Sequence, residues 1–237
     1  MTDLASTPVL ILAGGKATRL GDVTKAIPKA LVPLAGRPFV DHQFEDLYEQ
    51  GVREVIMCVG HFADQIRDYV GDGARFGLRV RYSEDGPTLR GTGGAVRRAL
   101  PLIGDGCFVL YGDSLLDVDY ARVFDSLSHT ALGLMTVFHN ENSFDKSNVL
   151  FQRGRLLRYS KQDATPDMTH IDYGLSLLRR AAIERIPAGQ PSDLAELYSA
   201  LVATGEMVGF EVTKRFYEIG SPSGLREAEQ FVLSRAA

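Results

Sequence analysis

The stretch LAGGKATRLGDVTKAIPKALVPLAGRP, residues 12–38, decides how the rest of this chain is interpreted. The apolar run Val9–Ala13 leads into it and is typical of a buried strand, and Gly14–Gly15 follow at once. Arg19 and Lys29 then bring two cations with few acidic residues between them. Backbone amides in a glycine turn can approach a phosphate closely, and nearby cations can neutralise it. The turn matches neither GxxxxGK[ST] nor GxGxxG, so taken alone it is equally consistent with a plain strand-to-loop turn.

The bulk composition narrows the class of protein. The 237 residues are 45% hydrophobic and 24% charged, which is ordinary for a globular protein. A net charge of −4 argues against non-specific nucleic-acid binding. The N-terminal apolar run is too short to span a membrane and lacks a basic segment before it, so we expect a cytoplasmic protein without a membrane partner. Cys58 and Cys107 lie in apolar runs and are predicted to be reduced core residues.

Apolar runs alternate with helical patterns through the first half of the chain. The predicted strands are Val9–Ala13, Glu54–Val59, Leu78–Tyr82 and Cys107–Tyr111, and the predicted helices are Pro38–Gln50, Phe62–Val70 and Thr92–Leu100. This order predicts an α/β fold with a Rossmann-like, mostly parallel mixed sheet flanked by helices on both faces. In such sheets ligands bind at the carboxyl ends of the strands.

The second half has a different pattern, with strands joined by short polar turns. Its predicted strands are Ala131–His139, Asn148–Phe151, Leu156–Tyr159, Ile171–Leu178 and Val208–Val212. The first four predict antiparallel additions to the sheet. Ser192–Thr204 is predicted as a helix with Ser192 as its N-cap, and Pro222–Leu233 as a helix near the C-terminus, after which we expect no further domain.

The opening stretch resembles the signature of the sugar-1-phosphate nucleotidylyltransferases, through LAGGKATRL, PKALVP and GRP. Three further motifs agree in the same order: GTGGA at Gly91–Ala95, YGDS at Tyr111–Ser114 and YEIGSP at Tyr217–Pro222. The resemblance covers essentially the whole chain. It implies a single nucleotidyltransferase domain over residues 1–237, with a nucleotide-binding half to about residue 130 and a sugar-phosphate-binding half after it. The implied partners are a nucleoside triphosphate and a sugar 1-phosphate, and a homo-oligomer stays open.

The resemblance also implies the roles of individual residues. Arg19 would hold the β- and γ-phosphates, Lys29 would bridge the α-phosphate and the sugar phosphate, and Asp113 would act in catalysis as a ligand of Mg²⁺. Glu218 stands where most relatives have the second, aspartate ligand of Mg²⁺. The implied substrate-binding residues are Leu12, Ala13, Gly14, Gly15, Glu84, Gly91, Thr92, Lys161, Asp172 and Gly174. Asp117 and Asp119 are better interpreted as carboxylates before a helix at Tyr120–Ser126.

The base and the sugar are harder to predict than the reaction. Glu84 or Asp85 could accept hydrogen bonds from a base, which slightly favours guanine because an ionised carboxylate only accepts; both acids could equally face solvent. The region from GDG to GTGGA resembles the D-glycero-D-manno-heptose 1-phosphate guanylyltransferase branch. The expected substrates are therefore GTP and a heptose or mannose-like sugar 1-phosphate. A UTP- or CTP-dependent enzyme acting, for example, on N-acetylmuramate 1-phosphate is the alternative.

Three departures from the family pattern keep another alternative open. Ala17 occupies a usual glycine position, Tyr111 stands where relatives often have asparagine, and Glu218 replaces aspartate. A nucleotide-sugar-binding homologue with little catalysis would tolerate such changes. The retained charged residues argue against it, so an enzyme is expected.

Overall fold

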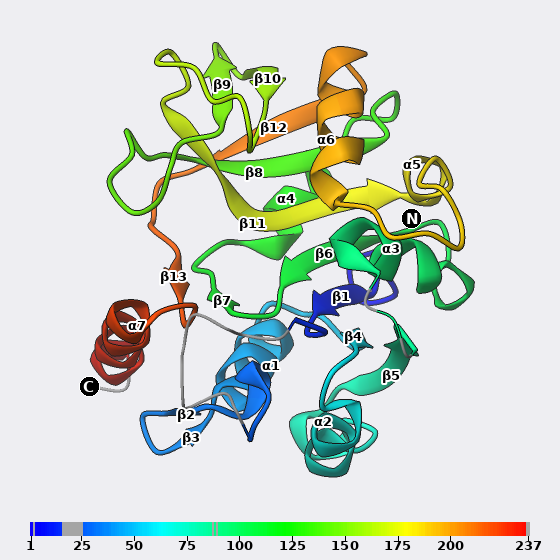
Figure 1. Ribbon diagram of the computed structural model, residues 1–237, viewed down its shortest axis with the longest axis vertical. Helices are drawn as coiled ribbons and strands as arrows, with labels where there is room; N and C mark the ends of the chain where they lie inside the picture. Colours follow the sequence, from blue (N-terminus) through cyan, green and yellow to red (C-terminus); the bar gives the residue numbers. More distant parts are fainter. Residues whose placement is uncertain (2, 16–25, 87, 89, 236–237) are drawn as a thin grey trace.

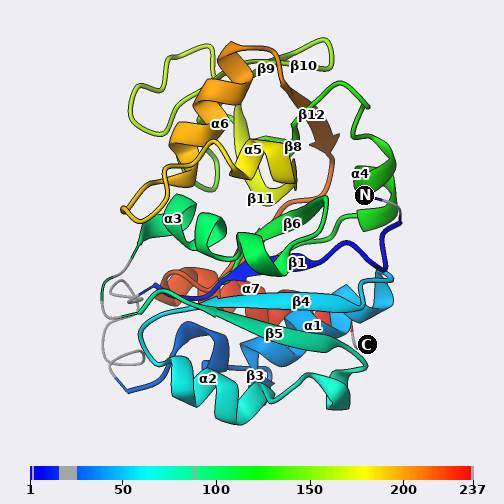
Figure 2. The same cartoon turned by 90° about the vertical axis from the view of Figure 1, so that its right-hand side faces the viewer.

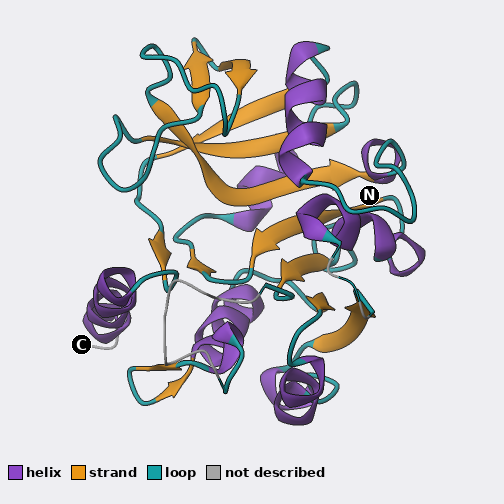
Figure 3. Cartoon of the chain, viewed as in Figure 1, coloured by secondary structure: helices purple, strands orange, loops and turns teal. Residues whose placement is uncertain are grey.

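A computed structural model of the protein describes residues 1, 3–15, 26–86, 88 and 90–235. The strands of its main sheet are β1 Val9–Leu12, β4 Glu54–Val59, β5 Arg79–Glu84, β6 Gly106–Tyr111, β8 Gly133–His139, β9 Val149–Gln152, β10 Arg155–Tyr159, β11 His170–Arg179 and β12 Met207–Val212. Within the described residues they form one sheet in the order β10-β9-β11-β6-β1-β4-β5, with β8 paired beside β11 and β12 paired beside β8 (Figures 1 and 3). Both halves of the chain contribute to this sheet.

Helices cover both faces of the sheet, as Figure 2 shows. They are α1 Phe39–Glu49, α2 Ala63–Val70, α3 Gly91–Arg98, α4 Tyr120–Asp125, α5 Arg180–Ile183, α6 Leu194–Ala203 and α7 Pro222–Arg235. Helices α1, α2 and α4 contribute to the core on one face, and α3, α5 and α6 to the core on the other. The predicted class, a mostly parallel mixed sheet flanked by helices, is confirmed.

The parallel centre of the sheet explains the continuous apolar runs of the first half. β6, β1, β4 and β5 are parallel neighbours. Along β1, Val9 and Ile11 face one core while Leu10 faces the other, and all three are buried. A strand buried on both faces is apolar at every position. Its side chains still point alternately to the two faces, so they divide between the two cores. Cys58 and Cys107 are free and buried in the second core, as predicted.

The second half adds strands of mixed direction. β11 is antiparallel to both β6 and β8, and β9 is antiparallel to β10. These pairings confirm the predicted antiparallel additions. β12 pairs in parallel with β8, through a register from Met207 opposite Gly133 to Val212 opposite Phe138.

Several short elements that the sequence analysis did not predict lie close to the opening stretch. They are a 3-10 turn at Lys29–Leu31, the pair β2 Pro33–Leu34 and β3 Arg37–Pro38, and the pair β7 Ser114–Leu115 and β13 Tyr217–Glu218. A third core that includes Val32, Leu115 and Ile219 joins them to α7. Ladders of two residues carry no periodic signal, because period-2 alternation needs at least four.

Most predicted boundaries lie within two residues of the observed ones, and one predicted cap was wrong. The N-cap of α6 is Asp193, whose carboxylate accepts from the Ala195 amide, rather than Ser192. Serine and aspartate both cap helices well, so residue type alone does not distinguish Ser192 from Asp193 as the N-cap. Among the described residues, no helix combines the length and apolar character needed to cross a bilayer.

Candidate active site

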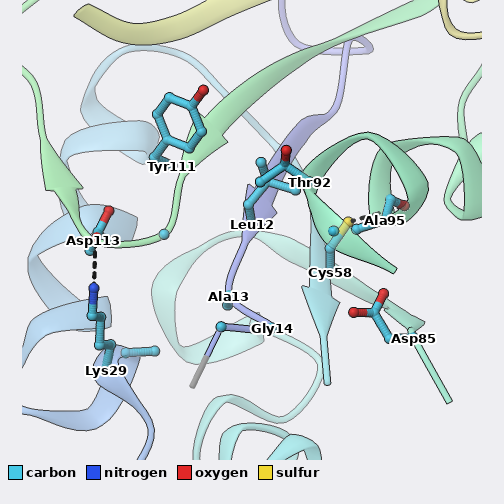
Figure 4. Close-up of a pocket in the computed structure, with 14 residues that line it drawn as sticks. Leu12, Ala13, Gly14, Lys29, Cys58, Asp85, Thr92, Ala95, Tyr111 and Asp113 are labelled. Carbon is cyan, nitrogen blue, oxygen red and sulfur yellow. Dashed lines mark hydrogen bonds and ion pairs between the residues drawn. The ribbon is translucent and has the colours of Figure 1, made fainter. Parts of the chain in front are cut away.

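A cavity of about 250 Å³ lies where β1, β4 and β6 end, at the carboxyl edge of the parallel strands (Figure 4). Of the predicted site residues, it is lined by Leu12, Ala13, Gly14, Gly15, Lys29, Gly91, Thr92 and Asp113. Cys58, Asp85, Ala95 and Tyr111 also line it. Residues far apart in the sequence therefore meet at the sheet edge where an open α/β fold binds ligands. Arg19 and Ala17 lie outside the described residues.

Lys29 and Asp113 form the charged wall of the cavity. The Lys29 ammonium donates to Asp113 Oδ2 at 2.6 Å, and the two side chains are only 20% and 23% exposed. Lys29 begins a 3-10 turn in which the Leu31 amide donates to the Pro28 carbonyl at 2.9 Å. Pro28, at φ −67°, stiffens the entry to that turn. The cation is thus held on a short, hydrogen-bonded turn and not on a free loop.

Gly91 shows why GTGGA needs its first glycine. Its φ is +70°, and a Cβ there would lie 2.5 Å from the Ser192 carbonyl oxygen. The same oxygen accepts from the Gly93 amide at 2.9 Å, while Thr92 donates to Asp193 at 3.0 Å. The N-terminus of α3 therefore packs directly against the segment that precedes α6.

Cys58 also lines the cavity. Burial raises the pKa of its thiol to about 12, so the thiol stays protonated and unreactive.

Asp85 replaces Glu84 as the acid inside the cavity. Glu84 is the last residue of β5; its carboxylate contacts Arg67, and it does not line this cavity. Asp85 is 5% exposed and lies across the cavity from Lys29 and Asp113 (Figure 4). A Cβ on Gly14 would lie 3.3 Å from Asp85 Oδ2, which places this carboxylate beside the glycine turn. Burial raises the pKa of Asp85 above the ordinary carboxyl value.

Glu218 approaches Asp113 through a short ladder. It pairs with Ser114 across β13 and β7, and the amide of Ile219 donates to the Asp113 carbonyl at 2.9 Å. The two carboxylates thus come from adjacent segments, although Glu218 does not line the main cavity. Mg²⁺ is commonly held by one or two carboxylates plus phosphate oxygens and water, and this oxygen-donor pair fits that pattern. Among the described residues no group of three acidic, histidine or cysteine side chains forms a metal cage.

Lys161, Asp172 and Gly174 lie beyond the cavity wall and meet at Tyr111. The Tyr111 hydroxyl donates to Asp172 Oδ2 at 3.4 Å and accepts from the Lys161 ammonium at 3.4 Å. Gly174, at φ +102°, brings its backbone against the Tyr111 ring, and its amide donates to Asp172 Oδ1 at 3.1 Å. The three predicted sugar-side residues therefore form one group around a side chain that the sequence analysis noted only as a departure.

Asp117 and Asp119 have structural partners outside the cavity. Asp119 caps α4 by accepting from the Arg122 amide at 3.0 Å, and Asp117 pairs with Lys214 at 2.7 Å. Their interpretation as carboxylates near a helix start is confirmed for Asp119, and neither lines the main cavity.

The comparisons with known proteins agree with this geometry. Residues 8–147 match the family model described as "Nucleotidyl transferase". The chain is 35% identical to the D-glycero-alpha-D-manno-heptose 1-phosphate guanylyltransferase of Campylobacter jejuni, over 58% of this chain and 59% of that protein. It is 29% identical to the UTP–glucose-1-phosphate uridylyltransferase of Synechocystis, over 95% of this chain and 63% of that protein. It thus spans about three-fifths of the length of these two relatives.

A solved structure supports both the fold and the assignment to the family. The crystal structure of HddC from Yersinia pseudotuberculosis superposes with a TM-score of 0.81 and 26% identity, over 95% of this chain and 99% of that one. A second structure of that protein is described as complexed with GMP-PN. The match of the family model to more than half of the residues, on a fold with its cavity at the strand ends, shows that the chain belongs to the nucleotidyl transferase family.

Proposed function

We propose that the protein transfers a nucleotidyl group from a nucleoside triphosphate to a sugar 1-phosphate. The observation that carries this proposal is the close Lys29–Asp113 pair facing the Gly14–Gly15 turn in one cavity. A phosphate oxygen of the sugar 1-phosphate attacks the α-phosphorus, the bond from that phosphorus to the β-phosphate bridging oxygen breaks, and pyrophosphate leaves with the electron pair. The product is a nucleotide-diphospho-sugar.

The chain's own residues position and neutralise two polyanions in this reaction. The amides of the glycine turn hold the nucleotide phosphates, and Lys29 lies between the α-phosphate and the incoming phosphate. Binding of the leaving pyrophosphate by Arg19 stays a prediction. Asp113 and Glu218 would hold Mg²⁺, which when bound neutralises phosphate charge. A cytoplasmic location and a homo-oligomer also stay predictions.

GTP is the proposed donor because Asp85 lies inside the nucleotide cavity. Guanine presents N1–H and an exocyclic amine side by side, and a carboxylate can accept from both. Uracil offers a single N3–H. The proposed acceptor is a heptose or mannose-like sugar 1-phosphate, which the name of the Campylobacter relative supports, whereas the name of the Synechocystis relative supports the UTP alternative.

Thermal unfolding with Mg²⁺ and each of GTP, UTP, CTP, ATP and dTTP tests the nucleotide. A ligand at about 100 times its Kd stabilises the folded state by about 2.7 kcal/mol, which raises the melting temperature visibly. We expect GTP to give the largest shift. A larger shift with UTP or CTP would overturn the base and keep the reaction class. The absence of a shift with all five would contradict the proposed function itself.

The base assignment has a sharper test in Asp85→Asn. The amide keeps one acceptor but turns a donor toward guanine, so we expect affinity for GTP to fall about 10- to 100-fold and affinity for UTP to change little. Because burial raises the pKa of Asp85, GTP affinity of the unaltered protein should be lost on acidification at a higher pH than for an exposed aspartate. Isothermal titration with each nucleotide measures both effects.

Glu84→Gln is the matched control, because Glu84 is the neighbouring acid and lies outside the cavity. It should bind GTP like the unaltered protein. Equal losses in the two variants, or a loss in Glu84→Gln alone, would refute the role of Asp85.

A further inference from the structure

Tyr111 is held rigidly at the junction between the nucleotide cavity and the sugar side. It ends β6, where it is paired with Leu12 of β1. The Gln43 side chain, buried on α1, donates to the Ser114 carbonyl at 2.9 Å and reaches the Tyr111 carbonyl at 3.5 Å. These contacts hold the backbone on both sides of Asp113, and with it the point from which the Tyr111 side chain extends.

The Tyr111 hydroxyl joins the two predicted sugar-side groups. It donates to Asp172 and accepts from Lys161, and the Lys161 ammonium also lies 5.4 Å from the Tyr111 ring centroid. The Asp172 carboxylate is fixed from its other side by the Gly174 amide. Lys161 has one further close ionic partner among the described residues, Asp193 at 4.0 Å. The phenol oxygen is thus the nearest polar partner of this ammonium among the described residues.

Both hydroxyl contacts are 3.4 Å long, which is longer than an ordinary hydrogen bond. Polar contacts in binding sites are often long until substrate binds and then tighten. A phenol also differs from asparagine in function: its ring supplies an apolar wall, and its single hydroxyl serves two charged partners at once. Asparagine at this position would be too short to reach both.

We infer that Tyr111 positions Lys161 and Asp172 for the acceptor and so helps to set which sugar 1-phosphate is used; this inference rests on the proposed function. Tyr111 acts through its two partners and is a positioning residue. Tyr111 itself lines the cavity, and Tyr111→Phe keeps its ring there. The partners of its hydroxyl, Lys161 and Asp172, do not line the cavity, so loss of the hydroxyl should affect the acceptor more than the nucleotide. Removing it loosens the lysine that would meet the acceptor phosphate and the carboxylate that would meet a sugar hydroxyl.

Tyr111→Phe tests the inference by steady-state kinetics with GTP and with α-D-mannose 1-phosphate or D-glycero-α-D-manno-heptose 1-phosphate. We expect KM for the sugar phosphate to rise about tenfold, KM for GTP to stay within twofold, and kcat to change less than the acceptor KM. Tyr69→Phe is the control, because its hydroxyl also bonds a carboxylate, Asp41, at 2.9 Å but between α2 and α1. It should leave both KM values unchanged.

A second background separates positioning from a general structural effect. If Tyr111 acts through Lys161 and Asp172, Tyr111→Phe should raise the acceptor KM about threefold or less when Lys161→Met and Asp172→Asn are already present. A tenfold rise in both backgrounds, or equal changes in the KM values of acceptor and nucleotide, would overturn the inference. If the unaltered protein turns over and Tyr111→Phe has the same acceptor KM, the inference would also be overturned. No turnover by the unaltered protein with either sugar phosphate and any nucleotide would instead contradict the proposed function.

Discussion

Replacing Lys29 by alanine should lower turnover by about 10²- to 10³-fold while the protein stays folded. The Lys29 ammonium lies in the cavity against Asp113. In the proposed reaction it would neutralise charge that develops on the α-phosphate. Its backbone hydrogen bonds do not involve the side chain, so the turn should survive the change. Release of pyrophosphate, followed with a coupled phosphate assay, gives the turnover, and circular dichroism checks the fold.

Lys214→Ala is the matched control for this loss. Lys214 also pairs with an aspartate, Asp117, at 2.7 Å, but both side chains are exposed and lie outside the main cavity. Exposed ion pairs contribute about 0–1 kcal/mol to stability, so turnover and melting temperature should hardly change. Turnover of Lys29→Ala within a few-fold of the unaltered protein would show that the proposed mechanism is wrong.

Asp113→Asn should have an effect of similar size, about 10²- to 10³-fold on turnover. The change keeps the shape but removes the negative charge that both Lys29 and Mg²⁺ would use. We therefore expect the variant to need more Mg²⁺ for its residual turnover, which a titration of MgCl₂ at saturating GTP measures.

Asp119→Asn controls for the loss of an acid in the same stretch. Asparagine caps a helix about as well as aspartate, so α4 and the melting temperature should be preserved, and turnover should match the unaltered protein. An Asp113→Asn variant with normal turnover and an unchanged need for Mg²⁺ would remove Asp113 from the site.

The sequence predicted the parallel strands well because burial on both faces leaves a strong signal. Glu54–Val59 was predicted with the observed bounds, and Val9–Ala13 was one residue too long. The position of Glu84 outside the main cavity could not be predicted for a simple reason. The predicted strand Leu78–Tyr82 ends two residues before the observed end of β5 at Glu84. Glu84 and Asp85 were therefore both placed in a turn, and the prediction could not distinguish the acid on the strand from the acid that follows it.

The role of Tyr111 could not be predicted from local patterns. Its partners Lys161 and Asp172 are 50 and 61 residues away in sequence. Asp172 meets it because β11 pairs with β6, and Lys161 lies on the segment that follows β10. The sequence distinguishes this position only because tyrosine stands where relatives often have asparagine. Its contacts with Lys161 and Asp172 are tertiary and can be seen only in the folded chain. The same is true of Gly91, where a Cβ would clash with the carbonyl of Ser192 on the segment before α6.

Formation of a nucleotide-diphospho-sugar is the most direct test of the central claim. The purified chain, incubated with Mg²⁺, GTP and α-D-mannose 1-phosphate or D-glycero-α-D-manno-heptose 1-phosphate, should yield the corresponding GDP-sugar and an equal amount of pyrophosphate, both identified by mass spectrometry. The same incubation with UTP and CTP covers the alternative donors. Stoichiometric product with any of these donors would support nucleotidyl transfer, and the preferred donor would fix the base. Hydrolysis of the nucleotide without a sugar product, or no reaction with every pair, would contradict it.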